Sequence, residues 1–163
     1  MKTMGCFEDD KATFEGFLEF VTILNLGIDN LDDPSSAEYR LLYLNYRLAV
    51  RLVPCALLCI DPYLYKQAIY NYAIHVFITL CFDINLDYLD KTKLINMGFS
   101  KGTGWRNGIV QAASDQATSV SYMTPEFYKN MSLNDFELLR TPFGREYEKL
   151  IQQVGTIWGL TSY

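Results

Sequence analysis

The stretch DPYLYKQAIYNYAIHVFITLCF, residues 61–82, decides the fold of this chain. Asp61 can accept hydrogen bonds from the free N–H groups that begin a helix, and Pro62 suits the first helical position, where its missing N–H would have no partner. From Tyr65 to Phe82 the side chains are apolar almost all round the helical period. Such a helix has to be covered on several sides. The sequence therefore predicts a central buried helix, and polar interruptions make a membrane span a poor interpretation.

Two amphipathic helices are predicted before this one. The first runs from Thr13, which can cap its start, to about Leu26, with Gly27 in the left-handed position that ends a helix. The second starts at Ser35 and ends or kinks at Pro54. Their apolar residues recur three and four positions apart, which is typical of helices that bury one face.

The region after the central helix changes character twice. Residues 97–108 hold four of the ten glycines and predict a long loop. Residues 109–123 have weak periodicity and predict either an extended arm or a short strand pair. A short helix beginning at Ser132 follows, and another restarts at Thr141 and Pro142 and stops at Gly155. We therefore expect one mostly α domain over residues 1–163, a small helical bundle with a long irregular or extended segment at about 97–125 and a C-terminal tail at 156–163.

The charge balance disfavours two classes of partner. The chain carries 14 Lys and Arg against 19 Asp and Glu, a formal net charge of −5. An acidic chain lacks the positive field that attracts nucleic acid non-specifically or draws a protein to anionic lipid. We expect neither a protein that grips nucleic acid nor one that binds a membrane.

The cysteines and the single histidine give little sign of a metal or a cofactor. Residues 1–10 lack the apolar core of a secretory signal, so the four cysteines are expected to be small buried hydrophobes rather than a disulfide framework. They are Cys6, Cys55, Cys59 and Cys81. Zinc sites usually need a second Cys pair or several His residues, which this chain does not have. No metal and no cofactor are predicted.

The side chains that could support catalysis also have simpler interpretations. His75 lies inside the predicted central helix, where a core histidine bonded to a neighbour is favoured over a general base. The glycines of residues 102–108 lack the GK[ST] ending and the following helix of a phosphate loop. Asp115 and Glu126 match no metal loop and are expected on a solvated face. The sequence predicts that the chain is not an enzyme.

Aromatic residues are numerous, with 12 Tyr and 10 Phe, and they can fill a core or form contact surfaces. Trp and Tyr are favoured anchors at interfaces. The apolar tail either docks on another chain or folds back over the core of its own. The candidate partner-binding residues are Trp105, Arg106, Tyr122, Ile157, Trp158, Leu160 and Tyr163.

Three stretches of the second half resemble a pattern in small structural proteins of tailed bacteriophages. They are GIVQAASDQATSVSYMTPE at 108–126, SLNDFELLRTPFGREY at 132–147 and GTIWGL at 155–160. The segment QAIYNYAIHVFI at 67–78 is similar to the middle helix of that group. The chain thus resembles the head–tail connector, or adaptor, proteins. The resemblance covers the C-terminal half, and it extends to the first third only by helical pattern.

This resemblance implies a place and a set of partners. Adaptors form a homo-oligomeric ring, commonly of twelve copies, that links the portal protein to the tail or nozzle proteins. The implied location is the neck of the virion, assembled in the host cytoplasm, with DNA passing through the channel without specific binding. The family offers no catalytic residue to carry over. An acidic channel also suits DNA that must slide without sticking.

Two other functions stay open. One is a different virion component, such as a tail-completion or minor head protein. The other is a small enzyme that uses the glycine-rich loop together with Asp115 or Glu126. A concave polar pocket converging on those residues would favour the enzyme.

Overall fold

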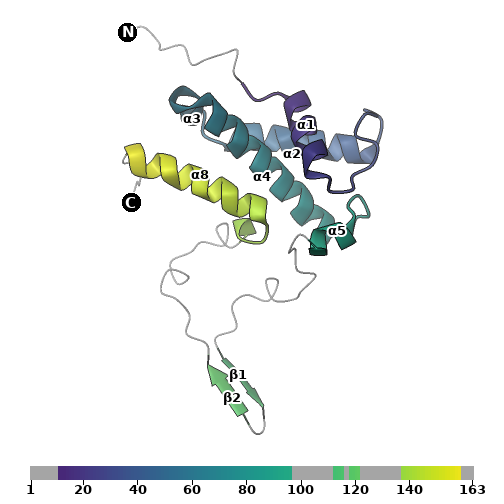
Figure 1. Ribbon diagram of the computed structural model, residues 1–163, viewed down its shortest axis with the longest axis vertical. Coiled ribbons are helices and arrows are strands. Elements are labelled where there is room, and N and C mark those ends of the chain that lie inside the picture. Colours follow the sequence, from purple (N-terminus) through teal and green to yellow (C-terminus); the bar gives the residue numbers. More distant parts are fainter. Residues whose placement is uncertain (1–10, 97–111, 116–117, 122–136, 159–163) are drawn as a thin grey trace.

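The computed structural model describes residues 11–96, 112–115, 118–121 and 137–158 (Figure 1). Helices dominate this part of the chain, which confirms the predicted mostly α class. The elements are α1 (Phe14–Leu24), α2 (Ala37–Leu52), α3 (Ala56–Ile60), α4 (Pro62–Asp83), α5 (Lys91–Asn96), β1 (Ala112–Asp115), β2 (Thr118–Ser121) and α8 (Pro142–Trp158).

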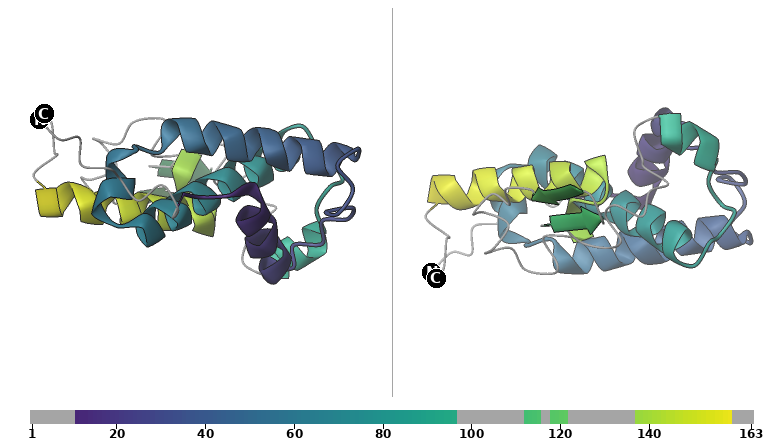
Figure 2. Two further views of the ribbon diagram at one scale, coloured as in Figure 1. Left: turned by 90° about the horizontal axis from the view of Figure 1, so that it is seen from above. Right: turned by 90° about the horizontal axis from the view of Figure 1, so that it is seen from below.

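Helix α4 is the centre of the bundle, as residues 61–82 predict. Helices α2 and α8 make the largest packing contacts with it, and α3 and α1 cover further parts. Both views of Figure 2 show α4 between α2 and α8. Buried side chains lie all round its axis, including Ile69, Ile74, Phe77 and Ile78, which are fully buried. None of the described helices, α4 included, has the length and hydropathy that a membrane span requires.

The start of α4 shows the expected cap. The Asp61 carboxylate accepts hydrogen bonds from the backbone N–H groups of Tyr63 at 2.8 Å and Leu64 at 3.3 Å. Pro62 occupies the first helical position, where no N–H is needed. Local chemistry therefore sets the first residue of the helix on which the others pack.

The first two helices differ from the predicted boundaries by one or two residues. Thr13 caps α1 as expected, but Asn25, with φ of 49°, takes the left-handed position after Leu24. Asn tolerates that conformation because its short polar side chain can bond locally. At α2 the cap is Ser36 rather than Ser35, which instead bonds to the Asp33 carboxylate.

Helix α8 corrects the prediction that Gly155 stops the last helix. It continues through Gly155 to Trp158, so the predicted tail at 156–163 begins with helical residues. A glycine inside a helix costs only about 1 kcal/mol, and packing elsewhere along a helix offsets that amount. Helix α8 buries Phe143 and Leu150 in the core that surrounds α4.

The irregular segment contains a short antiparallel hairpin. Strands β1 and β2 pair with Ala112 opposite Ser121 and Asp115 opposite Thr118. Of the two interpretations of residues 109–123, the strand pair is therefore present, at 112–115 and 118–121. Figure 1 shows the hairpin beyond the end of the helical bundle. The helix that was predicted to begin at Ser132 starts outside the described residues.

The cysteines depart from the expectation of burial. Cys81 is buried in α4 as expected, whereas Cys55 and Cys59 are exposed around α3. Cys59 is disulfide-bonded, which departs from the expectation that the cysteines are small buried hydrophobes, while Cys55 and Cys81 are free. The short α3 explains the exposure, because it turns only Leu57 and Leu58 inward.

The central position of α4 predicts a large difference between two aromatic truncations on it. Phe77→Ala removes a fully buried ring and should lower the free energy of unfolding by about 3–5 kcal/mol. Tyr63→Ala removes a ring that is 66% exposed and should change it by about 0.5 kcal/mol or less. Urea unfolding followed by far-UV circular dichroism measures both. Equal losses would contradict the placement of α4.

Candidate functional site

The residues predicted to bind partners lie mostly outside the described part of the chain. Ile157 and Trp158 belong to the last turn of α8. The others, Trp105, Arg106, Tyr122, Leu160 and Tyr163, fall in segments that the structure does not describe. The same holds for Glu126 and for the glycine-rich residues 102–108. Asp115 ends β1, opposite Thr118.

His75 is a core residue, which confirms its interpretation from sequence. Its side chain is 4% exposed, and its Nδ1 lies 2.8 Å from the Thr141 hydroxyl. That hydroxyl also accepts a hydrogen bond from the backbone N–H of Gly144 at 3.0 Å, so one side chain contacts both the ring and the first turn of α8. Burial lowers the pKa of His75 to about 4, so the ring is neutral at pH 7.

Gly144 allows α8 to approach α4 at this point. A Cβ on Gly144 would collide with the Leu138 carbonyl and would lie 2.8 Å from His75 Nδ1. The Thr141 hydroxyl caps the start of α8 and also contacts His75 in the middle of α4. No motif marks the function of Gly144 in advance, because the collision depends on residues that lie far away in sequence.

Arg140 forms the second link between these helices. Its guanidinium donates two hydrogen bonds to Asp83 at the end of α4, at 3.1 and 2.7 Å, and one to Glu137 at 2.8 Å. The hydrogen bonds to Asp83 raise the pKa of Arg140 most, and the hydrogen bond to Glu137 raises it further. A bidentate contact between a guanidinium and a carboxylate fixes the relative orientation of the two groups as well as their distance.

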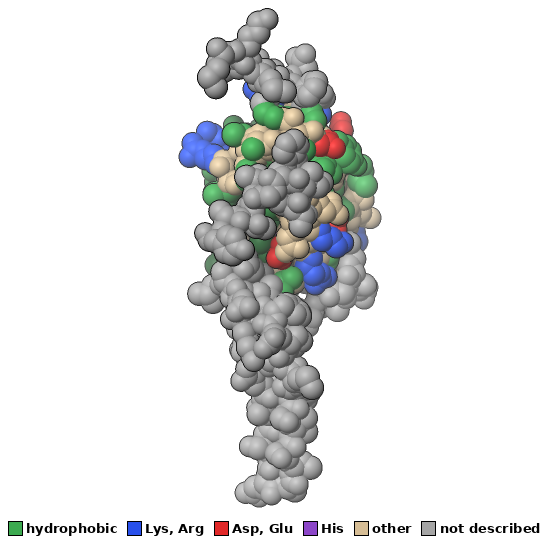
Figure 3. Space-filling view, turned by 90° about the vertical axis from the view of Figure 1, so that its left-hand side faces the viewer, with side chains coloured by type: hydrophobic (Ala, Val, Ile, Leu, Met, Phe, Trp, Pro, Cys, Tyr) green, Lys and Arg blue, Asp and Glu red, His purple; other side chains and the backbone are tan. Residues whose placement is uncertain are grey.

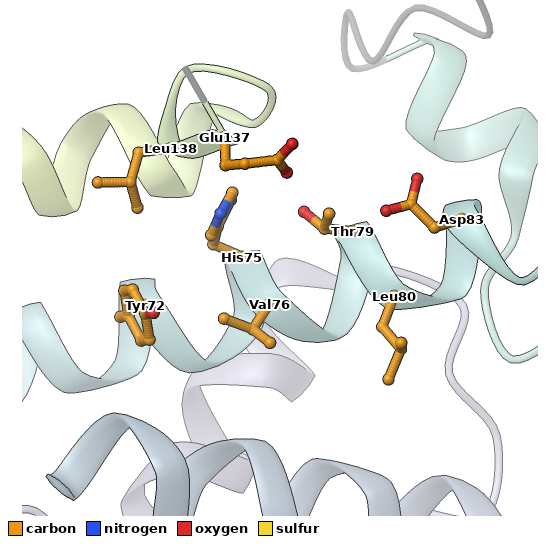
Figure 4. Close-up of a pocket in the computed structure, with 8 residues that line it drawn as sticks. All are labelled: Tyr72, His75, Val76, Thr79, Leu80, Asp83, Glu137 and Leu138. Atoms are coloured by element: carbon orange, nitrogen blue, oxygen red, sulfur yellow. The ribbon is translucent and has the colours of Figure 1, made fainter. Parts of the chain in front are cut away.

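A shallow hollow of about 230 Å³ lies between these two links (Figure 4). Its polar lining includes His75, Asp83 and Glu137, which are held by Thr141 or Arg140. The Thr79 hydroxyl is buried there without a hydrogen-bond partner in the described structure. Because Asp83 and Glu137 are both bound by Arg140, the hollow lies at a contact between α4 and the residues that precede α8.

The outward side of α2 is a surface that the sequence reasoning did not single out. Leu44, Leu48 and Leu52 are 61%, 41% and 52% exposed, and they follow one another four residues apart along the helix. The arginines at positions 40, 47 and 51 are exposed beside them. We call these six residues the α2 face. Its signal in the sequence is the excess of Leu over what the buried stripe of α2 requires.

A second surface lies beside α1. A groove of about 480 Å³ is lined by three acidic residues, Glu15, Glu19 and Asp32, and by apolar side chains. The apolar ones include Leu18, Leu31 and Ile23, and Ile23 is 81% exposed. We call these six residues the α1 groove. Figure 3 shows that hydrophobic side chains also reach the surface elsewhere on the helical body, among basic and acidic ones.

The comparisons leave the family of this chain open. No protein-family model, no curated protein and no solved structure matches it. Within the described residues, no group of three or more His, Cys, Asp or Glu is placed to hold a metal ion.

The burial of His75 predicts a loss of stability in mild acid. The ring has a pKa of about 4 when folded and about 6.5 when unfolded, so between these values the unfolded chain binds more protons. The free energy of unfolding should therefore fall as the pH drops from about 6.5 to about 4, by up to about 3 kcal/mol. Urea titrations across this interval measure the slope.

His75→Gln is the matched variant for this measurement. Glutamine can keep a hydrogen bond to Thr141 but does not titrate, so the slope between about pH 6.5 and pH 4 should become flatter. The groups that face the ring, Glu137 and Arg140, are unchanged in this variant. An unchanged slope would show that His75 is not the titrating group.

Proposed function

We propose that this chain is a structural protein of a tailed-phage virion, a ring-forming adaptor that joins the portal protein to the tail or nozzle proteins. In this proposal it is not an enzyme, and the DNA passes through the ring without specific binding. Its location is the neck of the virion, assembled in the host cytoplasm. The resemblance in residues 108–126, 132–147 and 155–160 supplies the identity of the assembly.

The hairpin is the observation that carries the proposal. The main contacts of β1 and β2 are with each other, and among the described helices none packs extensively on them. An isolated two-stranded hairpin is marginally stable in water. It gains stability when a third strand or a helix covers it, and another protein chain can supply either one. A hairpin at this position is therefore the kind of arm that an assembly subunit uses.

The helical body fits the second requirement, a rigid support for such an arm. Buried α4 and the two links from Thr141 and Arg140 hold α8 in one orientation. The undescribed contact candidates Trp105, Arg106 and Tyr122 lie in the segments that flank the hairpin in sequence. We assign them, with Ile157, Trp158, Leu160 and Tyr163, to contacts with neighbouring copies, portal or tail.

The net charge of −5 fits a channel protein that DNA must pass. Each phosphate contact from Lys or Arg adds to affinity for DNA and would hold it in place. A ring of acidic subunits avoids that retention. This supports the adaptor over a protein whose task is to hold the genome.

Replacing the hairpin tests the proposal. In a variant with all eight residues of β1 and β2 changed to Gly, the chain keeps its length but loses Thr118 and Val120, the two residues of high strand propensity, and every other side chain that restricts the backbone. Phage assembled with this variant should accumulate DNA-filled heads without tails, because the arm no longer joins its neighbours. Electron microscopy of the particles counts filled heads and joined tails.

Two controls make this result specific. The purified variant should keep the helical circular dichroism and the melting temperature of the natural chain, since the hairpin makes few contacts with the bundle. Val120→Ile, which preserves a β-branched side chain, should leave particles normal. Normal tails on the all-Gly variant would overturn the proposal. Normal joints combined with defective heads or unfinished tails would instead favour the other virion components.

A further inference from the structure

We propose that the α2 face of one copy of this chain docks in the α1 groove of the next copy. This contact would be the side-to-side contact of the proposed ring, and in that sense it rests on the proposed function. Its observations are separate from those of the hairpin. They concern two exposed surfaces, each with a row of apolar side chains beside charges of one sign.

The α2 face is basic as well as apolar. Arg40, Arg47 and Arg51 lie beside the leucine row, and the only acidic residue of α2, Glu38, lies in its first turn. No ion pair to another described residue engages Arg47 or Arg51. Arg47 instead lies over the ring of Tyr43, 5.9 Å from its centroid. These cations are therefore available to a partner.

The α1 groove is also apolar, but its charged residues are acidic, so its charge is opposite to that of the α2 face. Its three carboxylates stand beside Leu18, Ile23 and Leu31, and α1 contains no Lys or Arg. Within the described part of the chain, Glu15, Glu19 and Asp32 make no ion pair. A side chain as exposed as Ile23 at the mouth of such a groove is typical of a contact surface when other apolar groups adjoin it.

The two surfaces also agree in length. Leu44 and Leu52 are eight residues apart on α2, as are Glu15 and Ile23 on α1, which corresponds to about 12 Å along each helix axis. A leucine row of that length can lie along the groove while the arginines beside it meet the carboxylates. Opposite potentials of this kind steer association and fix register.

The two surfaces do not close on each other within one copy. Helix α1 stands on the flank of α2 that carries Tyr39 and Tyr43, where Phe14 packs edge-on against both rings. In both views of Figure 2, α2 runs along one edge of the molecule and α1 projects toward the other. A basic face therefore meets an acidic groove only when a second copy supplies it.

A contact between different surfaces of identical chains is head-to-tail, and it generates a ring if the rotation closes. The chain carries a net charge of −5, so copies repel one another in most orientations. The contact between the α2 face and the α1 groove is the orientation in which opposite charges meet. One helix face and one groove form a small interface compared with the ~800 Å² per partner of a stable complex. Each contact should be weak alone, and a closed ring adds a second contact to every copy.

Charge reversal on each side tests the pairing. Sedimentation velocity of the full chain should show concentration-dependent self-association at about 0.05 M salt that weakens at about 0.5 M, where charges are screened over shorter distances. Arg47→Glu with Arg51→Glu should weaken association at least about tenfold, and so should Glu15→Arg with Glu19→Arg. The matched control, Arg145→Glu with Lys149→Glu on exposed positions of α8, should associate like the natural chain.

Mixing the two reversed variants gives the decisive result. The acidic α2 face of one variant now fits the basic α1 groove of the other, and the unchanged basic α2 face of the second still fits the unchanged acidic α1 groove of the first. The mixture should regain the self-association of the natural chain, with the two variants alternating, although each variant alone is monomeric. Circular dichroism and melting temperature confirm that both variants are folded.

Three results would overturn this inference. They are a natural chain that stays monomeric at low salt and high concentration, reversed variants that associate as well as the natural chain, and a mixture of the two variants that stays monomeric. None of them removes the adaptor role, which is read from the particles with the altered hairpin. Tailless particles from the hairpin variant, together with a mixture of the two reversed variants that stays monomeric, would leave the adaptor role in place and would locate the contact between copies elsewhere.

Discussion

Helix α4 is apolar on nearly every side, and exposing these sides to water would cost free energy. The other helices are therefore arranged so that they cover it. Ile69, Ile74 and Phe77 project in different directions from the axis and are all fully buried. Burying large side chains of this kind contributes roughly 1.5–3 kcal/mol each. Helices α2 and α8 supply most of the cover, so the position of every described surface follows from how these two helices pack on α4.

The cover on the α8 side is held by polar contacts as well as by apolar packing. His75 reaches Thr141 at the start of α8, and Arg140 reaches Asp83 at the end of α4. Apolar packing alone would permit α8 to slide or rotate, whereas separating the buried His75 and Thr141 would leave buried polar atoms without partners, which costs free energy. The absence of a side chain on Gly144 lets the two helices meet closely enough for the His75 contact. Arg140, Thr141 and Gly144, which lie around the start of α8, thus set the orientation of this helix.

Local chemistry made much of this fold predictable from the sequence. The caps at Thr13 and Asp61 and the apolar periodicity of α4 depend on residues close together in the chain. The end of α8 was predicted wrongly, because packing along a helix can outweigh the local preference of Gly155 to end it. The contact between His75 and Thr141 spans 66 positions, so no local pattern could reveal its partner. The candidate contact residues came mainly from composition, and most fall in segments outside the described structure.

The same difference between local and distant information explains why the α2 face was not recognised in advance. Periodicity indicates the inward side of α2, where Leu42 and Ala49 are fully buried, although Tyr43 and Val50 keep the same period and are exposed. Periodicity does not explain why the exposed residues Leu44 and Leu48 are also apolar, because polar side chains would serve equally well on a face in contact with water. A helix that is apolar on its core face and partly apolar outside has two surfaces to cover. The first is covered by α4, and the second is left for a partner that recognises arginine beside leucine.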